Sequence, residues 1–330
     1  MKKIIIVFLS VLLTLSLAAC GGNPGQPASN ESVPQAPVSQ DSEAPVAESG
    51  AAGKNVSILT PYLSSVTTNQ MVDRMKAEME AKGMLVTVVD TKGDFAQLAS
   101  RIEDTVTAKA DAIVIVSTDP GQIATALQSA FDSGIPVFGC DSGFLEGMHV
   151  NATSDNYAMG ELITRYLFED LMGGKGTVIA LTHRPHPGVL QRCEAFDNLL
   201  GEYPDISLIT EQHVEVPGPI ENSRQTLENL ILSNSQPDSI TAVWCAWDEP
   251  AIGVSQALEA SGRDEVLVTG VDGNSQAVEM IETGSPLKAT VSQNFDGMAA
   301  IVTEEMTKLF EGVAIEKGDK YAPATLIKAA

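Results

Sequence analysis

Residues 112–141 read AIVIVSTDPGQIATALQSAFDSGIPVFGCD, and this stretch decides the fold class. A run of β-branched residues is followed by an apolar stripe with helical spacing at Ile123, Leu127 and Phe131, and then by a second short apolar run. Both runs are apolar throughout rather than alternating, which is typical of strands buried on both faces of a parallel sheet. The stretch therefore predicts a strand, a crossover helix and a second, parallel strand.

The same alternation continues along the chain. The predicted strands are Val56–Thr60, Leu85–Asp90, Ala112–Ser117, Ile135–Gly139, Thr177–Leu181, Ile206–Glu211, Ile240–Ala246, Val266–Val271 and Leu287–Ser292. The stretches between them carry apolar stripes with helical spacing, such as Met71, Met75 and Met79. Buried strands alternating with amphipathic helices predict an α/β fold whose parallel sheets are covered on both faces. Ligands of such sheets bind beyond the carboxyl ends of the strands, so functional side chains are expected directly after each apolar run.

The first 53 residues precede this pattern and have the features of an export signal and a tether. Two lysines and an apolar run end in Leu17-Ala18-Ala19-Cys20, which resembles the lipobox of bacterial lipoproteins. This predicts a signal peptide at 1–19 and lipid on Cys20, with an ordinary secretory signal as the alternative. Residues 20–53 are rich in Pro, Ser and Gly and predict a disordered tether. The protein is expected outside the cytoplasm, anchored by lipid at the outer face of the cytoplasmic membrane or periplasmic.

Charge and cysteine content narrow the class of protein. A formal net charge of −23 argues against nucleic acid and anionic lipid headgroups as partners. Cys140, Cys193 and Cys245 have no CxxC spacing and lie in or beside predicted elements. They are therefore expected to be small buried thiols rather than a disulfide framework.

Six short motifs in a fixed order carry a resemblance to a known family. They are GIPVFGCD at 134–141, TSDN at 153–156, QRCEAF at 191–196, WDEPAIG at 247–253, GVDG at 270–273 and KATVSQN at 288–294. With these motifs, nearly everything after Lys54 resembles the periplasmic sugar-binding proteins of ABC transporters, of the ribose-binding type.

The resemblance implies two doubly wound parallel-sheet lobes joined by three crossovers, the type I periplasmic binding protein fold. The implied N-terminal lobe is 54–152 plus 293–318, and the implied C-terminal lobe is 153–292 plus 319–330. The implied crossovers fall near Asn151–Ser154, Val291–Gln293 and Lys317–Tyr321.

The resemblance also implies a function. A monomeric extracytoplasmic solute-binding lipoprotein would capture a monosaccharide or related polyol between its lobes and deliver it to an ABC permease, without a cofactor. The same fold also fits the ligand-sensing protein of a membrane receptor complex, and the sequence does not distinguish the two.

Four ligand-binding residues are carried over from the family by position. Asp141 and Asp272 are implied to accept hydrogen bonds from sugar hydroxyls, Arg192 to donate to sugar oxygens, and Gln293 to reach the ligand from the last hinge strand. Each has a structural alternative. The two Asp residues could cap turns, Arg192 could form a surface ion pair, and Gln293 could be an exposed strand-end residue.

Three departures from the family concern the ligand. Trp247 stands where relatives have Asn, and Ser142 stands where they have Arg. The loop at 60–70 has Tyr62 as its only aromatic residue, where relatives carry a pair of Phe, and Tyr62 is expected to contact the ligand. Loss of a donor and an amide, with an indole gained, predicts a deoxy sugar or one with an apolar substituent.

The segment VWCAWDEPAIG at 243–253 could be a catalytic acid pair or the start of a helix. Trp244 is expected in the core, whereas Trp247 ends the strand and offers its face for stacking on a sugar ring. Asp248 is expected to cap the next helix and Glu249 to lie in its first turn. Adjacent carboxylates diverge, and no catalytic motif is present, so the protein is not expected to be an enzyme.

The loop THRPHPG at 182–188 also follows a predicted strand. His183 and His186 could be metal ligands, but Pro185 prevents a helical ligand face and no partner with zinc-site spacing lies nearby. No metal is expected, and His183 is expected to contact the ligand with its edge.

Overall fold

The computed structural model describes residues 50–329, which form one compact unit. The predicted signal peptide, Cys20 and almost all of the predicted tether lie outside the described residues.

The described residues form two lobes. The first lobe contains β1 (Asn55–Thr60), α1 (Val66–Ala81), β2 (Leu85–Asp90), α2 (Phe95–Thr107), β3 (Ala112–Val116), η1 (Pro120–Ile123), α3 (Ala124–Asp132), β4 (Val137–Cys140), β5 (Val150–Thr153), α9 (Phe295–Phe310) and β11 (Gly318–Tyr321). The second lobe contains α4 (Asn156–Arg165), η2 (Tyr166–Leu171), β6 (Gly176–Thr182), α5 (Pro187–Glu202), β7 (Ile206–His213), α6 (Pro219–Ser233), β8 (Ala242–Cys245), α7 (Asp248–Ser261), β9 (Leu267–Asp272), α8 (Ser275–Glu282), β10 (Leu287–Ser292) and β12 (Thr325–Lys328).

Each lobe is built on one six-stranded sheet of the described chain. The first sheet has the order β11-β5-β4-β3-β1-β2 and is parallel throughout. The second has the order β12-β10-β9-β8-β6-β7 and is parallel except at β12. The predicted α/β class is confirmed, and all nine predicted strands are present with bounds within two residues.

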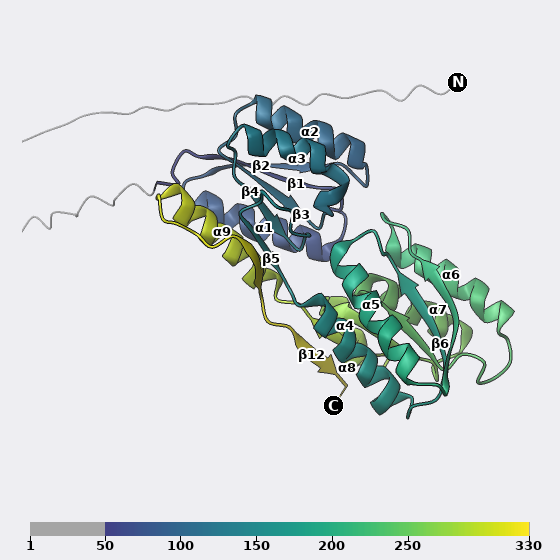
Figure 1. Ribbon diagram of the computed structural model, residues 1–330. Helices are drawn as coiled ribbons and strands as arrows, with labels where there is room; N and C mark the ends of the chain where they lie inside the picture. The colour runs from purple at the N-terminus through teal and green to yellow at the C-terminus, as the bar shows by residue number, and fades with distance from the viewer. Residues whose placement is uncertain (1–49, 330) are drawn as a thin grey trace, which may run out of the picture. The chain divides into compact units, whose positions relative to one another are not determined.

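The chain passes between the lobes after β5, after β10 and after β11 (Figure 1). Helix α9 follows β10 of the second sheet but packs on α1 and β5 of the first lobe. The predicted lobe boundary at 318/319 is wrong, because β11 continues to Tyr321. Its backbone pairs with β5 from Gly318↔Val150 to Tyr321↔Thr153, so the chain returns to the second lobe at 322–324.

Side-chain caps place helix starts at the carboxyl edges of the sheets. Asp94, Asp155, Asn274 and Asn294 each accept a hydrogen bond from a backbone N–H in the first turn of the following helix. Three of the strands before them, β5, β9 and β10, are mostly buried, whereas the edge strand β2 before Asp94 is partly exposed. The loops at these edges are thereby held in fixed positions by a rigid scaffold.

The prediction that Asp248 caps helix α7 is wrong. The helix begins at Asp248 itself, and Trp247 occupies the capping position without a side-chain hydrogen bond. The buried Asp248 carboxylate instead accepts from the backbone N–H of Asn274 at 2.7 Å. It therefore ties the start of α7 to the turn between β9 and α8.

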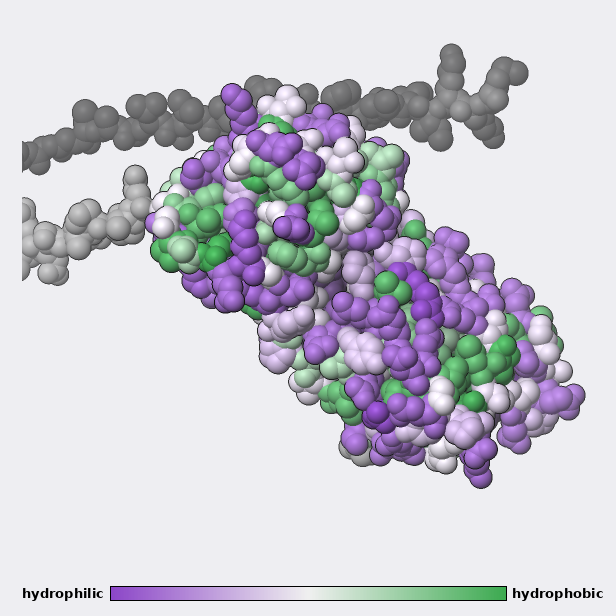
Figure 2. All heavy atoms as spheres, in the orientation of Figure 1, coloured by the Kyte–Doolittle hydropathy of each residue, from purple (hydrophilic) through white to green (hydrophobic). Residues whose placement is uncertain are grey.

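The face of the described residues shown in Figure 2 is mostly hydrophilic, and the three predicted thiols lie in the interior. Hydrophilic residues cover most of the described face in Figure 2, and apolar residues appear as separate patches. The prediction for the three cysteines is confirmed, since Cys140, Cys193 and Cys245 are all free and buried. Within residues 50–329, no helix has the length and apolar character needed to cross a membrane.

Candidate ligand-binding site

A pocket lies where the carboxyl edges of the two sheets meet. From the first lobe it is lined by Tyr62, Ser65, Thr67, Thr68, Ser117 and Asp141. From the second lobe it is lined by His183, His186, Val189, Arg192, Val216, Trp247, Glu249 and Asp272. Six of the seven ligand-binding residues predicted from sequence line this pocket, and Gln293 does not. Asp141, Trp247 and Asp272 lie at the ends of buried strands, as the strand-end rule predicts, whereas Arg192 lies within α5 and was implied by the resemblance.

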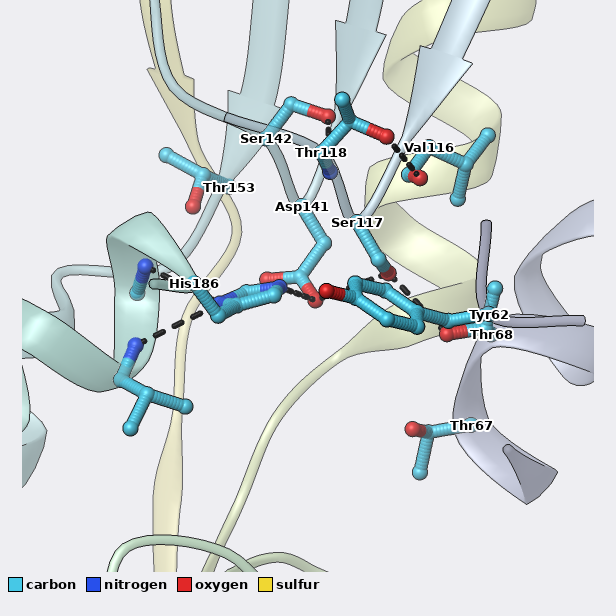
Figure 3. A network of polar contacts seen from close by, with 12 residues as sticks. Tyr62, Thr67, Thr68, Val116, Ser117, Thr118, Asp141, Ser142, Thr153 and His186 are labelled. Atoms are coloured by element: carbon cyan, nitrogen blue, oxygen red, sulfur yellow. Dashed lines mark hydrogen bonds and ion pairs between the residues drawn. The ribbon is translucent and has the colours of Figure 1, made fainter. Parts of the chain in front are cut away.

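Asp141 is the charged residue that the first lobe contributes. It follows β4 in the left-handed backbone region, with φ 50°, and its side chain is 7% exposed. Oδ2 accepts a hydrogen bond from Ser117 Oγ at 3.4 Å, whereas the buried Oδ1 has no partner among the described residues. Figure 3 shows the carboxylate directed toward His186, with Tyr62 beside it. Burial raises the pKa of Asp141 to about 6, against the opposing charge of Arg192.

Ser142, next in the chain, does not reach the pocket. Its Oγ donates to the backbone of Ile115 at 3.1 Å and accepts from the N–H of Thr118 at 3.1 Å. In Figure 3 this hydroxyl lies on the far side of the loop from the Asp141 carboxylate. Neither a cation nor a polar side chain at 142 therefore accompanies Asp141 in the pocket.

Arg192 is the central cation of the second lobe. Its side chain is 2% exposed, so the alternative of a surface ion pair is wrong. Nε donates to Asn156 Oδ1 at 2.8 Å, and Nη1 donates to the carbonyl of Ala246 at 2.9 Å and to Asp272 Oδ1 at 3.4 Å. Helix α4 approaches closely at Gly160, where a Cβ would lie 2.6 Å from the Arg192 Cα. The guanidinium is thus held rigidly by three separate elements.

Asp272 ends β9 with φ 131°, and Gly273 follows with φ 74°. Its Oδ1 accepts from Arg192 and, at 2.8 Å, from Gln293 Nε2. Burial raises its pKa, Arg192 opposes the rise, and the carboxylates of Asp141 and Glu249 add to it. The carboxylate thus bonds to other side chains, and it does more than cap its own turn.

Gln293 is predicted to contact the ligand, and its buried side chain places its amide nitrogen on Asp272. The alternative of an exposed strand-end residue is wrong. Its Nε2 bonds to Asp272, and its buried Oε1 has no partner among the described residues. Gln293 therefore orients a carboxylate that lines the pocket.

Aromatic residues from both lobes form the walls. Trp247 is 8% exposed and lies edge-on to His183, with ring centroids 6.1 Å apart. The Tyr62 hydroxyl lies 3.4 Å from His183 Nε2, across the pocket. His183 Nδ1 lies 3.1 Å from the carbonyl of Val214, which can only accept, so Nδ1 carries the proton and Nε2 accepts from Tyr62. Trp244 is fully buried against Phe196, as predicted.

Two ionisable pocket residues were missed as ligand-binding candidates. Glu249, which was placed in the first turn of α7, accepts from Trp247 Nε1 at 3.3 Å and from Ser65 Oγ at 3.2 Å. His186 caps α5 through Nδ1, and its Nε2 lies 3.7 Å from Asp141 Oδ2. Burial lowers the pKa of His186 to about 3, so the ring is neutral. The signal for His186 was present in the strand-end loop at 182–188, whereas nothing in the sequence marks which side of α7 faces the pocket.

The arrangement suits recognition of a small polar ligand. In the described part of the chain, no group of three or more His, Cys, Asp and Glu residues could hold a metal ion. Asp248 and Glu249 diverge, the first toward Asn274 and the second into the pocket. Contacts such as Ser65–Glu249 and Tyr62–His183 link the lobes directly across the pocket. A ligand between them would touch both lobes.

Two α/β lobes connected by three chain passages, with a polar and aromatic pocket between them, define a two-lobed solute-binding protein. The chain belongs to the periplasmic binding protein domain family, whose model matches residues 56–313.

Relatives in this family are binding proteins of transporters. The chain is similar to the ribose import binding protein RbsB of Bacillus subtilis (strain 168), with 30% identity over 324 residues, or 96% of each chain. It is also similar to the crystal structure of an ABC sugar transporter subunit from Rhodobacter sphaeroides 2.4.1, with 26% identity and a TM-score of 0.80 over 84% of this chain and 99% of that one. A third relative is the structure of an ABC transporter solute binding protein from Agrobacterium vitis with bound allitol. It shows 26% identity and a TM-score of 0.79 over 84% of this chain and 96% of that one.

Proposed function

We propose that the protein captures a monosaccharide or a related polyol in the pocket and delivers it to an ABC importer. The observation that carries this proposal is the buried set of Arg192, Asp272 and Asp141 lining one pocket with Trp247. Carboxylates accept hydroxyl protons and a guanidinium donates to hydroxyl or ring oxygens, while an indole face stacks on the C–H face of a sugar. The relatives support the same class of ligand, since their names state ribose, sugar or allitol.

Ligand capture proceeds by lobe closure. Asp141 approaches the ligand from the first lobe, and Arg192, Asp272 and Trp247 approach it from the second. A ligand that contacts both lobes favours the closed arrangement, because its extra contacts exist only there. The membrane permease then binds the closed monomer, which presents both lobe surfaces together.

The ligand itself is a deoxy or substituted sugar or polyol. Trp247 supplies an apolar wall, and Ser142 donates to backbone rather than to the pocket. Mass spectrometry of the compound that co-purifies with the protein, followed by calorimetric titration of a sugar panel, tests this proposal. Tight binding of plain ribose or galactose, with no preference for deoxy or substituted sugars, would contradict the proposal that the ligand is a deoxy or substituted sugar. Failure of every sugar and polyol to bind would contradict the proposal that the ligand is a sugar or polyol at all.

Replacing Trp247 with Ala is expected to weaken ligand binding by about 10–100-fold, through lost apolar contact and lost stacking. Trp247→Phe keeps a ring but lacks the donor to Glu249, so it separates stacking from the hydrogen bond.

Ligand binding should also change the tryptophan emission of the wild type, because Trp244 is buried in the core and Trp247 lines the pocket. Trp247→Phe should abolish this change, and a signal that persists in that variant would place the ligand elsewhere.

Lipid on Cys20 anchors the protein at the outer face of the membrane. Cys20→Ser is expected to remove the lipid from the N-terminal region of the exported protein, because the thiol is the attachment point. Mass spectrometry of the N-terminal peptide from the wild type and the variant measures the modification. A wild-type peptide whose Cys20 carries no lipid mass would contradict the anchor.

A further inference from the structure

The ligand pocket carries more negative than positive charge. Its lining includes three carboxylates, Asp141, Asp272 and Glu249, and one guanidinium, Arg192. The lining also includes two histidines, His183 and His186, and burial lowers the pKa of both. They are neutral at pH 7 and do not offset the carboxylates.

Arg192 forms an ion pair with one pocket carboxylate, Asp272, and acts on Asp141 only from a longer distance. It is paired with Asp272 and donates its remaining described bonds to Asn156 and the backbone of Ala246. Among the described residues, neither Asp141 nor Glu249 has a Lys or Arg within ion-pair distance, and the only such neighbour of Asp141 is the neutral His186. Two buried carboxylates, Asp141 and Glu249, therefore line the pocket without a Lys or Arg in ion-pair contact.

Asp141 has an acceptor ready for such a cation. Its side chain is more than nine-tenths buried, and its Oδ1 has no hydrogen-bond partner among the described residues. Trp247 and Tyr62 line the same pocket, and aromatic faces attract cations. An ammonium group is compact and has three donors, so it can bond to a carboxylate and also lie against a ring.

We propose that the ligand is a sugar or polyol bearing a protonated amine, whose ammonium group is held by Asp141 and Glu249. This inference rests on the proposed function and names the substituent. Asp141 belongs to the first lobe and Glu249 to the second, so an ammonium that contacts both carboxylates would also favour closure. A neutral polyol could donate hydroxyl protons to the same oxygens but would leave the excess negative charge in the pocket.

The test compares matched pairs by calorimetry at pH 7.5 and low salt, using the purified protein. The probes are 2-amino-2-deoxyhexoses, 1-amino-1-deoxyalditols and amino-inositols, each beside its hydroxyl parent and its N-acetyl derivative. At least one amine should bind about tenfold or more tighter than its parent, as expected for a charge-assisted bond. Its N-acetyl derivative should lose the advantage, since it keeps the bulk without the charge.

Variants assign the effect to the carboxylates. Glu249→Gln should lower the ratio of amine affinity to parent affinity by about tenfold. If the Glu249→Gln variant does not fold, Asp141→Asn serves as the second variant, with the same expected result. Glu259→Gln, at an exposed position on the same helix, should leave the ratio unchanged. Tighter binding of the parents, or an amine preference that survives both pocket variants, would overturn the inference while the proposed function stands. Binding of none of the amines, parents or N-acetyl derivatives would overturn both.

Discussion

Replacing Arg192 with Ala is expected to lower ligand affinity by more than about 100-fold and the free energy of unfolding by about 3–5 kcal/mol. The guanidinium is 2% exposed and bonds to Asn156, Ala246 and Asp272 at once. Its removal leaves the acceptors of these three residues without their donor and the buried Asp272 without its cation. Calorimetric titration measures the affinity, and urea denaturation measures the stability.

Arg184 offers a matched control in the same lobe. It forms ion pairs with Glu211 and Asp197, and its side chain is about one-third exposed. Exposed pairs contribute little, so Arg184→Ala should change stability by less than about 1 kcal/mol and leave ligand affinity unchanged. If Arg192→Ala bound ligand as tightly as the wild type, the pocket described above could not be the binding site.

Most of the fold could be predicted because its central strands are buried on both faces. Burial of this kind selects unbroken β-branched runs such as the one in β3, and these are visible without any tertiary information. The strands β5, β11 and β12 were missed because β5, with the sequence VNAT, has no apolar run, and β11 and β12 have exposed positions. Their extended conformation depends on pairing with a neighbouring strand, as β11 pairs with β5.

The site was predictable to the level of the loop but not of the side chain. Asp141 and Trp247 could be located because they directly follow buried strands. The orientation of Glu249 could not, because a first-turn acid is equally compatible with solvent, the helix dipole and the pocket. Gln293 shows the same limit, since its position beside the pocket is correct but its amide turns to Asp272.

Replacing Asp141 with Asn is expected to stabilise the ligand-free protein at pH 8 and to lower its affinity for ligand at least about tenfold. The carboxylate is buried, and its φ of 50° lies in a region that Asn also tolerates. Because the folded-state pKa of Asp141 is raised to about 6, the folded protein binds more protons than the unfolded chain between about pH 4 and 6. The wild type thus loses stability through this group as pH rises through 6, whereas the variant does not.

The stability gained by Asp141→Asn should therefore be larger at pH 8 than at pH 5, by about 1.4 kcal/mol. Urea denaturation of both proteins at the two pH values measures this difference, and the buried histidines cancel because both proteins contain them. Asp132→Asn, at an exposed position in the same lobe, should leave the pH profile of the wild type unchanged. An equal effect of Asp141→Asn at pH 5 and pH 8 would mean that burial of this carboxylate has no cost. A buried carboxylate that destabilises the ligand-free protein is expected at a position where a bound ligand removes this destabilisation. Asp141 is therefore identified as a ligand-binding residue if Asp141→Asn both lowers ligand affinity and raises stability.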